Sequence, residues 1–491
     1  MHKRWPKFAI LGFVLVVSAF GIHLARTRPG LFSDQSLLGG VIFLQVLLAC
    51  IWKFRQSFFT FLMVAFTGAG LDLPLAGAWT SLRWIVLAVG ALVGFMVFMH
   101  DRRRQFGVVH LLAFCCVLGA FVSAGVSVLP RAAFLKAVSL LLLFLYASSG
   151  GRLAILGRES GFLRGLIWAC EVIVYLTFPA YVVFHTEPWG NTNSLGMVMG
   201  VIVAPVLLWA VLTAKRRVLR WRYSFALVLA IFLLFLGLSR AGILAAFVAM
   251  AVLLFLTRRR RLLITSSIVV LTLVAVVALW DPVALQNYGS ESAKTVLYKG
   301  HQQEGLLGSR RSPWQETTDV ISQHPWFGSG FGTSPVGAAD DMGNFSSTAS
   351  SNREHGSSFL TIFEWVGLVG IMPFVALLFM LVWTIVRMLV WVYRANAPSH
   401  PAVPIVLVLV AALIHAGFED WLFAVGFYLT VLFWTFAFML VDFVEVLDFS
   451  PAKAAGSWRL HPVADSVSLA QRAVGTISMR SISAGSVNPR R

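Results

Sequence analysis

Long apolar runs recur along almost the whole sequence, and few charged residues interrupt them. A helix that crosses a bilayer needs about 20 apolar residues. Of the 491 residues, 58% are hydrophobic and only 12% are charged, whereas about 25% of the residues of a soluble globular protein are charged. This composition excludes a soluble enzyme, a disordered protein and a nucleic-acid-binding protein. It predicts an all-α polytopic integral membrane protein.

The apolar runs predict about 12–14 transmembrane helices. We expect the first to be retained, because Ser18 to His23 lacks a convincing signal-peptide cleavage site. Two stretches could each form a hairpin or one kinked helix, namely 223–257, which Ser239-Arg240 interrupts, and 401–442, which Glu419-Asp420 interrupts. With both taken as hairpins, the fourteen predicted spans are 8–24, 37–52, 58–73, 81–99, 108–129, 132–148, 162–184, 194–213, 223–238, 241–257, 262–280, 359–386, 401–418 and 421–442.

The distribution of basic residues favours fourteen spans. Cytoplasmic segments of membrane proteins carry an excess of Lys and Arg. With the N-terminus inside, fourteen spans place most of the 39 Lys and Arg on the cytoplasmic side. The runs at 100–104, 215–222 and 257–261 share that side only if both interrupted stretches are hairpins. The charge pattern therefore predicts that both ends of the chain are cytoplasmic.

The sequence divides into five regions. Residues 281–358 form a large periplasmic loop, in which repeated aromatic residues indicate a packed cap. Residues 450–491 are predicted to be a basic, disordered cytoplasmic tail near anionic lipid. The other regions are N-terminal transmembrane helices (1–189), transmembrane helices with a Ser-Arg motif (190–280) and C-terminal transmembrane helices (359–449).

Arginine and histidine residues near the predicted outer face are candidates for a site. Arg240 either reaches toward the headgroups as an interfacial arginine or offers its guanidinium to a phosphate or pyrophosphate. Arg310 and Arg311 form either a solvated loop pair or part of the same anion site. His355 stands where the loop meets the membrane, in a place to act as a base on substrate at the interface. His324, in a His-Pro pair close to several glycines, is read mainly as a turn-former.

Three acidic residues are further candidates. Glu171 falls inside a predicted span and is a functional candidate by default, although a structural partner such as Lys136 is equally possible. Asp340 and Asp341 could hold a divalent ion, but two adjacent carboxylates in a Gly- and Ser-rich loop are weak evidence. No nucleotide-binding, zinc-peptidase or serine-hydrolase motif is present. We therefore predict neither a metal nor a cofactor.

In order along the chain, five segments resemble the bacterial O-antigen ligase and O-antigen polymerase (Wzy-type) superfamily. That family shows an Asn-containing segment that opens a helix, a Ser-Arg turn, an Arg shortly before a Trp, a His-Pro-x-x-Gly-x-Gly element, and a His followed by a helix with Glu-x-x-Gly. The late EDWLFAVG at 419–426 is similar to a segment of exopolysaccharide polymerases. The matching segments here are GNTNSLG (190–196), LSRAGILA (238–245), SRRSPW (309–314), HPWFGSGFG (324–332) and HGSSFLTIFEWVGLVG (355–370). One departure is Gly356, because the family most often has Asn after the His; Asn352 could replace it.

The resemblance implies a GT-C-like, metal-independent, inverting glycosyltransferase of the bacterial inner membrane. Its donor would be a glycan on undecaprenyl pyrophosphate, and its acceptor another lipid-linked glycan (polymerase) or lipid A–core (ligase). By resemblance, Arg240 and Arg310, or Arg311 in the neighbouring register, hold the pyrophosphate. His355 deprotonates the acceptor hydroxyl at the periplasmic face. Supporting roles fall to Asn193, His324, Glu419 and Asp420.

Two alternatives remain open. A lipid-linked oligosaccharide flippase or other transporter could use Glu171 and the basic residues along a path. Against it, no internal repeat is visible and few spans contain polar residues. A scaffolding membrane protein is the third possibility. Between polymerase and ligase, EDWLFAVG and the tail favour surface-polysaccharide polymerisation. The sequence does not give the oligomeric state.

Overall fold

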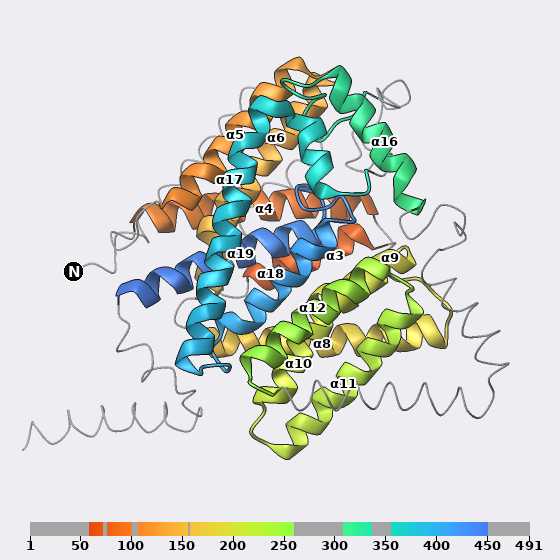
Figure 1. Ribbon diagram of the computed structural model, residues 1–491, viewed down its shortest axis with the longest axis vertical. Coiled ribbons are helices and arrows are strands. Elements are labelled where there is room, and N and C mark those ends of the chain that lie inside the picture. Colours follow the sequence, from red (N-terminus) through yellow and green to blue (C-terminus); the bar gives the residue numbers. More distant parts are fainter. Residues whose placement is uncertain are drawn as a thin grey trace, which may run out of the picture. The chain divides into compact units, whose positions relative to one another are not determined.

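The computed structural model describes residues 58–71, 76–100, 107–155, 158–259, 308–335 and 355–449. Within these ranges every regular element is a helix, which confirms the predicted all-α fold (Figure 1). The elements are α3 (Phe58–Gly70), α4 (Ala76–His100), α5 (Val108–Val126), α6 (Pro130–Leu145), η2 (Tyr146–Gly150), α7 (Gly151–Ile155), α8 (Glu159–Val182), α9 (Thr192–Met197), η3 (Val198–Val203), α10 (Ala204–Thr213), α11 (Arg217–Leu236), α12 (Arg240–Leu256), α16 (Gly308–Gln323), α17 (Ser358–Ala395), α18 (Ala402–Ala416) and α19 (Tyr428–Phe449).

Seven helical segments in the described ranges are long and apolar enough to cross a membrane. Shorter apolar helices accompany them, as expected for helices that pack inside a bundle. The seven are Ala78–Met99, Val108–Val126, Pro130–Ile155, Glu159–Val182, Thr192–Thr213, Arg217–Leu236 and Ser358–Ala395, and the shorter ones are Phe58–Gly70, Arg240–Leu256, Ala402–Ala416 and Tyr428–Val444. Three predicted spans, 8–24, 37–52 and 262–280, lie outside the described residues, as does the tail 450–491.

The two interrupted stretches are each divided into separate helices. α11 ends at Leu236 and α12 begins at Arg240, with Ser239 as its N-cap. The predicted span 421–442 is wrong at its start, because residues 417–427 form a non-helical turn before α19. This turn is apolar because it is buried in protein. The carbonyl of Leu422 accepts a hydrogen bond from Trp434 Nε1 at 3.0 Å, and Trp421 Nε1 donates to His415 Nδ1 at 3.0 Å.

A break at Gly367 divides α17, which packs along α5. Gly367 has φ +65°, and the glycine-rich loop that follows α16 inserts its backbone at this point. The amides of residues 368–369 donate to the carbonyls of 325–326 at 2.8 and 3.0 Å, and the amides of 329–330 donate to the carbonyls of 364–365 at 2.9 and 3.2 Å. The break thus exposes backbone groups that the loop satisfies. The glycine-rich loop and the first part of α17 are therefore one folded unit.

The Asn-containing segment and the Ser-Arg turn also pack together. A Cβ on Gly196 would lie 2.1 Å from Ser239 Cβ, and a Cβ on Gly200 would lie 2.2 Å from the Gly242 carbonyl oxygen. Only glycine permits backbones to approach so closely. These glycines therefore fix the start of α12, and with it Arg240, against α9 and η3.

Substituting Gly200 by valine tests this packing. The added side chain meets backbone, which cannot move aside, so we expect the free energy of unfolding to fall by about 1–3 kcal/mol or more. Thermal unfolding in detergent, followed by loss of monodisperse protein on heating, measures the change. Gly165→Val in α8 is the matched control, since a Cβ there meets nothing within 4 Å. Equal melting temperatures for the two variants would contradict the close approach.

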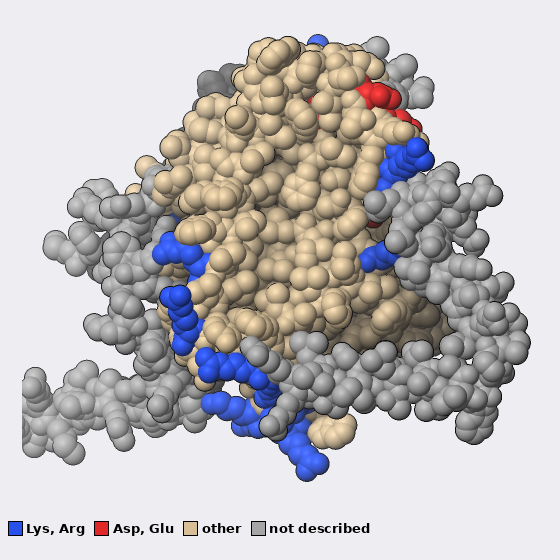
Figure 2. Space-filling view, in the orientation of Figure 1, with Lys and Arg blue, Asp and Glu red and all other residues tan. Residues whose placement is uncertain are grey.

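Basic residues gather at one end of these helices. Arg258, just after α12, donates to the Tyr393 carbonyl near the end of α17 at 3.3 Å, and Trp209 near the end of α10 donates to the Pro398 carbonyl at 2.9 Å. Figure 2 shows Lys and Arg side chains along the lower edge of the view, where these helix ends lie. The exposed ones at these ends are Lys215, Arg216, Arg217, Arg220, Arg222, Arg258, Arg259, Arg387 and Arg394. Arg240 and Ser358 stand at the opposite ends of α12 and α17.

Candidate active site

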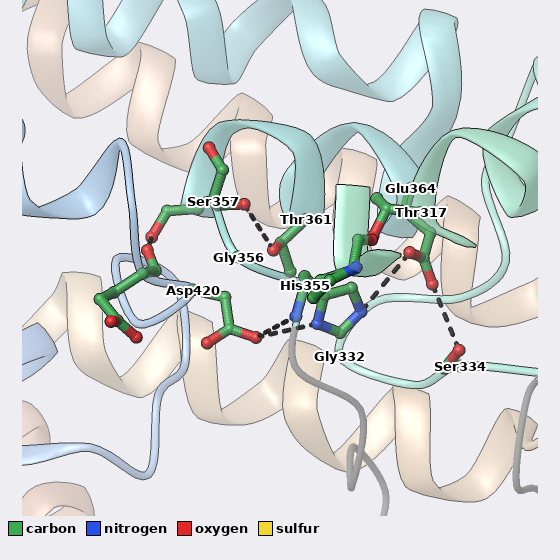
Figure 3. A network of polar contacts seen from close by, with 12 residues as sticks. Thr317, Gly332, Ser334, His355, Gly356, Ser357, Thr361, Glu364 and Asp420 are labelled. Atoms are coloured by element: carbon green, nitrogen blue, oxygen red, sulfur yellow. Dashed lines mark hydrogen bonds and ion pairs between the residues drawn. The ribbon is translucent and has the colours of Figure 1, made fainter. Parts of the chain in front are cut away.

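His355 lies between two carboxylates, close to the N-terminus of α17 (Figure 3). Its Nδ1 is 2.9 Å from Oδ2 of Asp420, which also accepts the His355 amide at 3.1 Å. Its Nε2 is 3.4 Å from Oε2 of Glu364. The imidazole is fully buried, whereas 29% of the Asp420 side chain is exposed to solvent. His355 is therefore an interior residue that reaches the surface through Asp420.

Glu364 completes this network from the first part of α17. Its side chain is fully buried and accepts a hydrogen bond from Ser334 Oγ at 3.3 Å, while its carbonyl accepts the Ser329 amide. We did not predict Glu364 as a site residue from the sequence. A signal was available, because it is the sole charged residue in the apolar run 359–386, and intramembrane acids are functional candidates by default.

The network favours a charged imidazole. Burial opposes the imidazolium, but the hydrogen bonds and negative charges of Asp420 and Glu364 outweigh it, so the pKa of His355 is raised above its ordinary 6.5. Burial also opposes the Asp420 carboxylate, but hydrogen bonds and charge from His355 outweigh this and lower the pKa of Asp420. The two carboxylates therefore favour the protonated imidazole, and only its neutral form can act as a base.

Two arginines lie beside this network. Arg310, in the first turn of α16, forms an ion pair with Glu419. A Cβ on Gly356 would lie 3.4 Å from Arg310 Cδ, so the guanidinium stem passes next to the residue that follows His355. Arg240 at the start of α12 is within electrostatic range of Arg310. The site thus combines two cations with a His–carboxylate network.

The turn at residues 417–427 supplies a carboxylate to Arg310 and another to His355. Ser358 donates to the Glu419 carbonyl from its amide at 3.0 Å and from its hydroxyl at 2.6 Å, and the same hydroxyl accepts the Leu422 amide at 3.0 Å. Because of these backbone contacts, consecutive carboxylates reach different partners. Glu419 reaches Arg310, and Asp420 reaches His355.

The departure at Gly356 has a conformational explanation. Gly356 has φ +70°, and its carbonyl accepts Trp314 Nε1 at 3.1 Å. Asn is among the non-glycine residues that best tolerate such a backbone. Glycine adopts this backbone without strain, and it brings no side chain to the site. Asn352, the suggested substitute, lies outside the described residues.

The remaining candidates are Arg311, His324 and Asn193. Arg311 is exposed, so Arg310 is the member of the pair that meets Glu419. His324 is exposed and lies in the turn after α16, where its carbonyl accepts the Gly328 amide at 3.2 Å. Asn193 lies in the first turn of α9, three residues before Gly196, which faces Ser239.

Glu171 has a structural partner of its own. Glu171 pairs with Arg222, whose Nε lies 2.6 Å from Oε1, while Lys136 donates to the Gly332 carbonyl. The suggested Glu171–Lys136 pair is therefore wrong. Asp340 and Asp341 lie outside the described residues. Within the described ranges, no group of three or more His, Cys, Asp or Glu side chains could hold a metal ion.

The fold and this site define a polytopic helical membrane protein with a pair of arginines beside a His–carboxylate network. The family model described as O-antigen ligase matches residues 225–375. The match confirms the resemblance to the O-antigen ligase and polymerase superfamily, and it supports a membrane glycosyltransferase of that type. The segment holds Arg240, Arg310, His355 and Glu364 but ends before Glu419. A search of curated proteins finds no match to the chain.

Proposed function

We propose that this protein transfers a glycan from undecaprenyl pyrophosphate to a sugar hydroxyl. The observation that carries the proposal is the position of Arg310 beside Gly356, because it brings a guanidinium next to the His355 network. Arginines neutralise the charge that develops on a departing pyrophosphate and stay protonated without a metal. A base beside them can take the proton of the attacking hydroxyl.

The reaction breaks the bond between the anomeric carbon and the pyrophosphate oxygen and forms a bond to the acceptor oxygen. Arg240 and Arg310 stabilise the leaving pyrophosphate. The acceptor proton passes to the imidazole of His355, whose Nδ1 is held by Asp420. Glu364 now faces Nε2 at 3.4 Å, so in this proposal the acceptor hydroxyl takes the place of that carboxylate. Attack opposite the leaving group inverts the anomeric centre.

The site is proposed to face the periplasm of a bacterial inner membrane. Its residues stand at the ends of α12 and α17 opposite the exposed basic residues. By the positive-inside rule, the basic ends are cytoplasmic. Of the two possible acceptors, a second lipid-linked glycan is favoured over lipid A–core, which makes the protein a surface-polysaccharide polymerase.

Deletion of the gene in its host, complemented with wild type or with His355→Ala, tests the proposal. The readouts are extracted lipopolysaccharide, secreted polysaccharide and undecaprenyl-linked glycans. A polymerase defect leaves single repeat units on the carrier and no long polymer. A ligase defect leaves long glycan on the carrier and bare lipid A–core. If no glycan pool changed, the glycosyltransferase proposal would be wrong and transport would become the leading explanation.

Glu364→Gln tests the proton balance of the site. Transfer that needs a neutral imidazole rises with pH through the raised pKa of His355. Removing one of the two negative charges lowers that pKa, so we expect the acidic limb of the pH profile of kcat/KM to move down by about one pH unit. Glu187→Gln, at an exposed glutamate, is the control and leaves the limb in place. A limb that stayed fixed, or moved up, in Glu364→Gln would exclude this role.

A further inference from the structure

We propose that the Glu419 carboxylate occupies the donor site as its resident anion, which means that it pairs with Arg310 while no donor is bound. The donor pyrophosphate then replaces this carboxylate on Arg310. The inference rests on the proposed function, since it takes Arg240 and Arg310 as the pyrophosphate site. It makes Glu419 a residue that sets donor affinity and product release.

The charges of the site support an internal anion. Arg240 and Arg310 are close enough to repel each other, and the Glu419 carboxylate neutralises part of that charge while no donor is bound. A carboxylate and a phosphate present similar oxygen pairs to the planar guanidinium. A phosphate that carries more negative charge can therefore exchange for the carboxylate at the same nitrogen atoms.

The way Glu419 is anchored allows this exchange. Its backbone is held by Ser358 through two hydrogen bonds to its carbonyl. The contact with Arg310 is made by the Glu419 side chain and not by its backbone. The Arg310 side chain is 12% exposed to solvent and the Glu419 side chain is 20% exposed. The side chain can thus rotate away while the turn and the Asp420–His355 contact stay in place. Substrate can reach the ion pair without unfolding the site.

The exchange also provides a route for product release. After transfer, undecaprenyl pyrophosphate remains on the arginines with its full charge. The returning Glu419 carboxylate competes for Arg310 and promotes dissociation of the product. Neutralising Glu419 should therefore tighten binding of donor and product together. A purely structural residue would weaken binding when replaced.

Binding to purified full-length protein in nanodiscs tests the inference, with inorganic pyrophosphate and undecaprenyl pyrophosphate as probes. We expect Glu419→Gln to bind both about tenfold more tightly than wild type, which corresponds to one ion pair of about 1.4 kcal/mol. Glu419→Asp, whose shorter side chain reaches Arg310 less well, should fall between the two. In transfer assays, KM for the donor should fall together with kcat. Glu316→Gln, at an exposed glutamate of α16 that pairs with Ser312, should match wild type.

The outcomes separate this inference from the proposed function. If wild type binds pyrophosphate and Arg310→Ala weakens binding, the donor site stands. Unchanged or weaker binding by both Glu419 variants, with wild-type melting temperatures, would then overturn the resident-anion role alone. If wild type binds neither probe, the proposed donor site itself fails. Should Glu419→Gln unfold, the same prediction is decided by Glu419→Asp.

Discussion

His355→Ala is expected to lower the rate of glycan transfer by about 10²–10⁴-fold, the usual contribution of a general base. The variant loses the imidazole that contacts both Asp420 and Glu364. It also leaves the buried Glu364 and the partly exposed Asp420 without the imidazole between them. We therefore expect some loss of thermal stability as well as of activity.

Single-turnover transfer from a purified lipid-linked donor separates these two effects. His355→Gln keeps a polar group between the carboxylates but supplies no base, so it should retain more of the stability than His355→Ala and remain equally inactive. His324→Ala, at an exposed histidine in the turn after α16, should transfer at the wild-type rate. Transfer within a few-fold of wild type by folded His355→Gln would remove this residue from the mechanism.

Arg240→Ala and Arg310→Ala are each expected to lower transfer by about 10²–10³-fold, the usual cost of losing one electrostatic donor in a transition state. Loss of either guanidinium leaves less positive charge for the departing pyrophosphate. Lysine at these positions keeps the charge but not the paired donors, so Arg→Lys variants should recover part of the rate. Initial rates against donor concentration measure both kcat and KM.

Arg311→Ala is the matched control for this pair. Arg311 is the exposed neighbour of Arg310, so its loss should leave kcat near the wild-type value. A large loss in Arg311→Ala together with normal transfer by Arg310→Ala would show that the register of the motif is the other one. Normal transfer by folded Arg240→Ala would limit the donor site to α16.

Much of the fold could be predicted because a membrane helix has a simple signature. Length and apolarity located most of the described apolar helices and the break at Ser239, but not the polar helix α16 inside the predicted loop 281–358. The same signature failed at residues 417–427, since a turn buried among helices is as apolar as a span. It also could not reveal Gly367, because the break in α17 is stabilised by a loop that precedes it by about forty residues.

The sequence predicted most of the residues of the candidate site but not which of them pair with one another. Motif order singled out Arg240, Arg310 and His355, and the structure brings Arg310 and His355 to neighbouring positions. The partners could not be deduced. Glu419 and Asp420 are adjacent in the chain yet serve different residues, and this division depends on the hydrogen bonds of Ser358. Burial of His355 was likewise invisible, because it arises from loops that fold over it.

The turn at 417–427 has a consequence for how the protein is made. Membrane proteins are synthesised from the N-terminus, and their segments fold as they emerge. Arg310 and His355 are both synthesised before Glu419 and Asp420, the carboxylates with which they pair. Until Glu419 and Asp420 leave the ribosome, Arg310 lacks its ion-pair partner and His355 lacks its Nδ1 partner. The ion pair and the histidine–carboxylate contact therefore form late in biogenesis, once the turn before the last described helix has been synthesised.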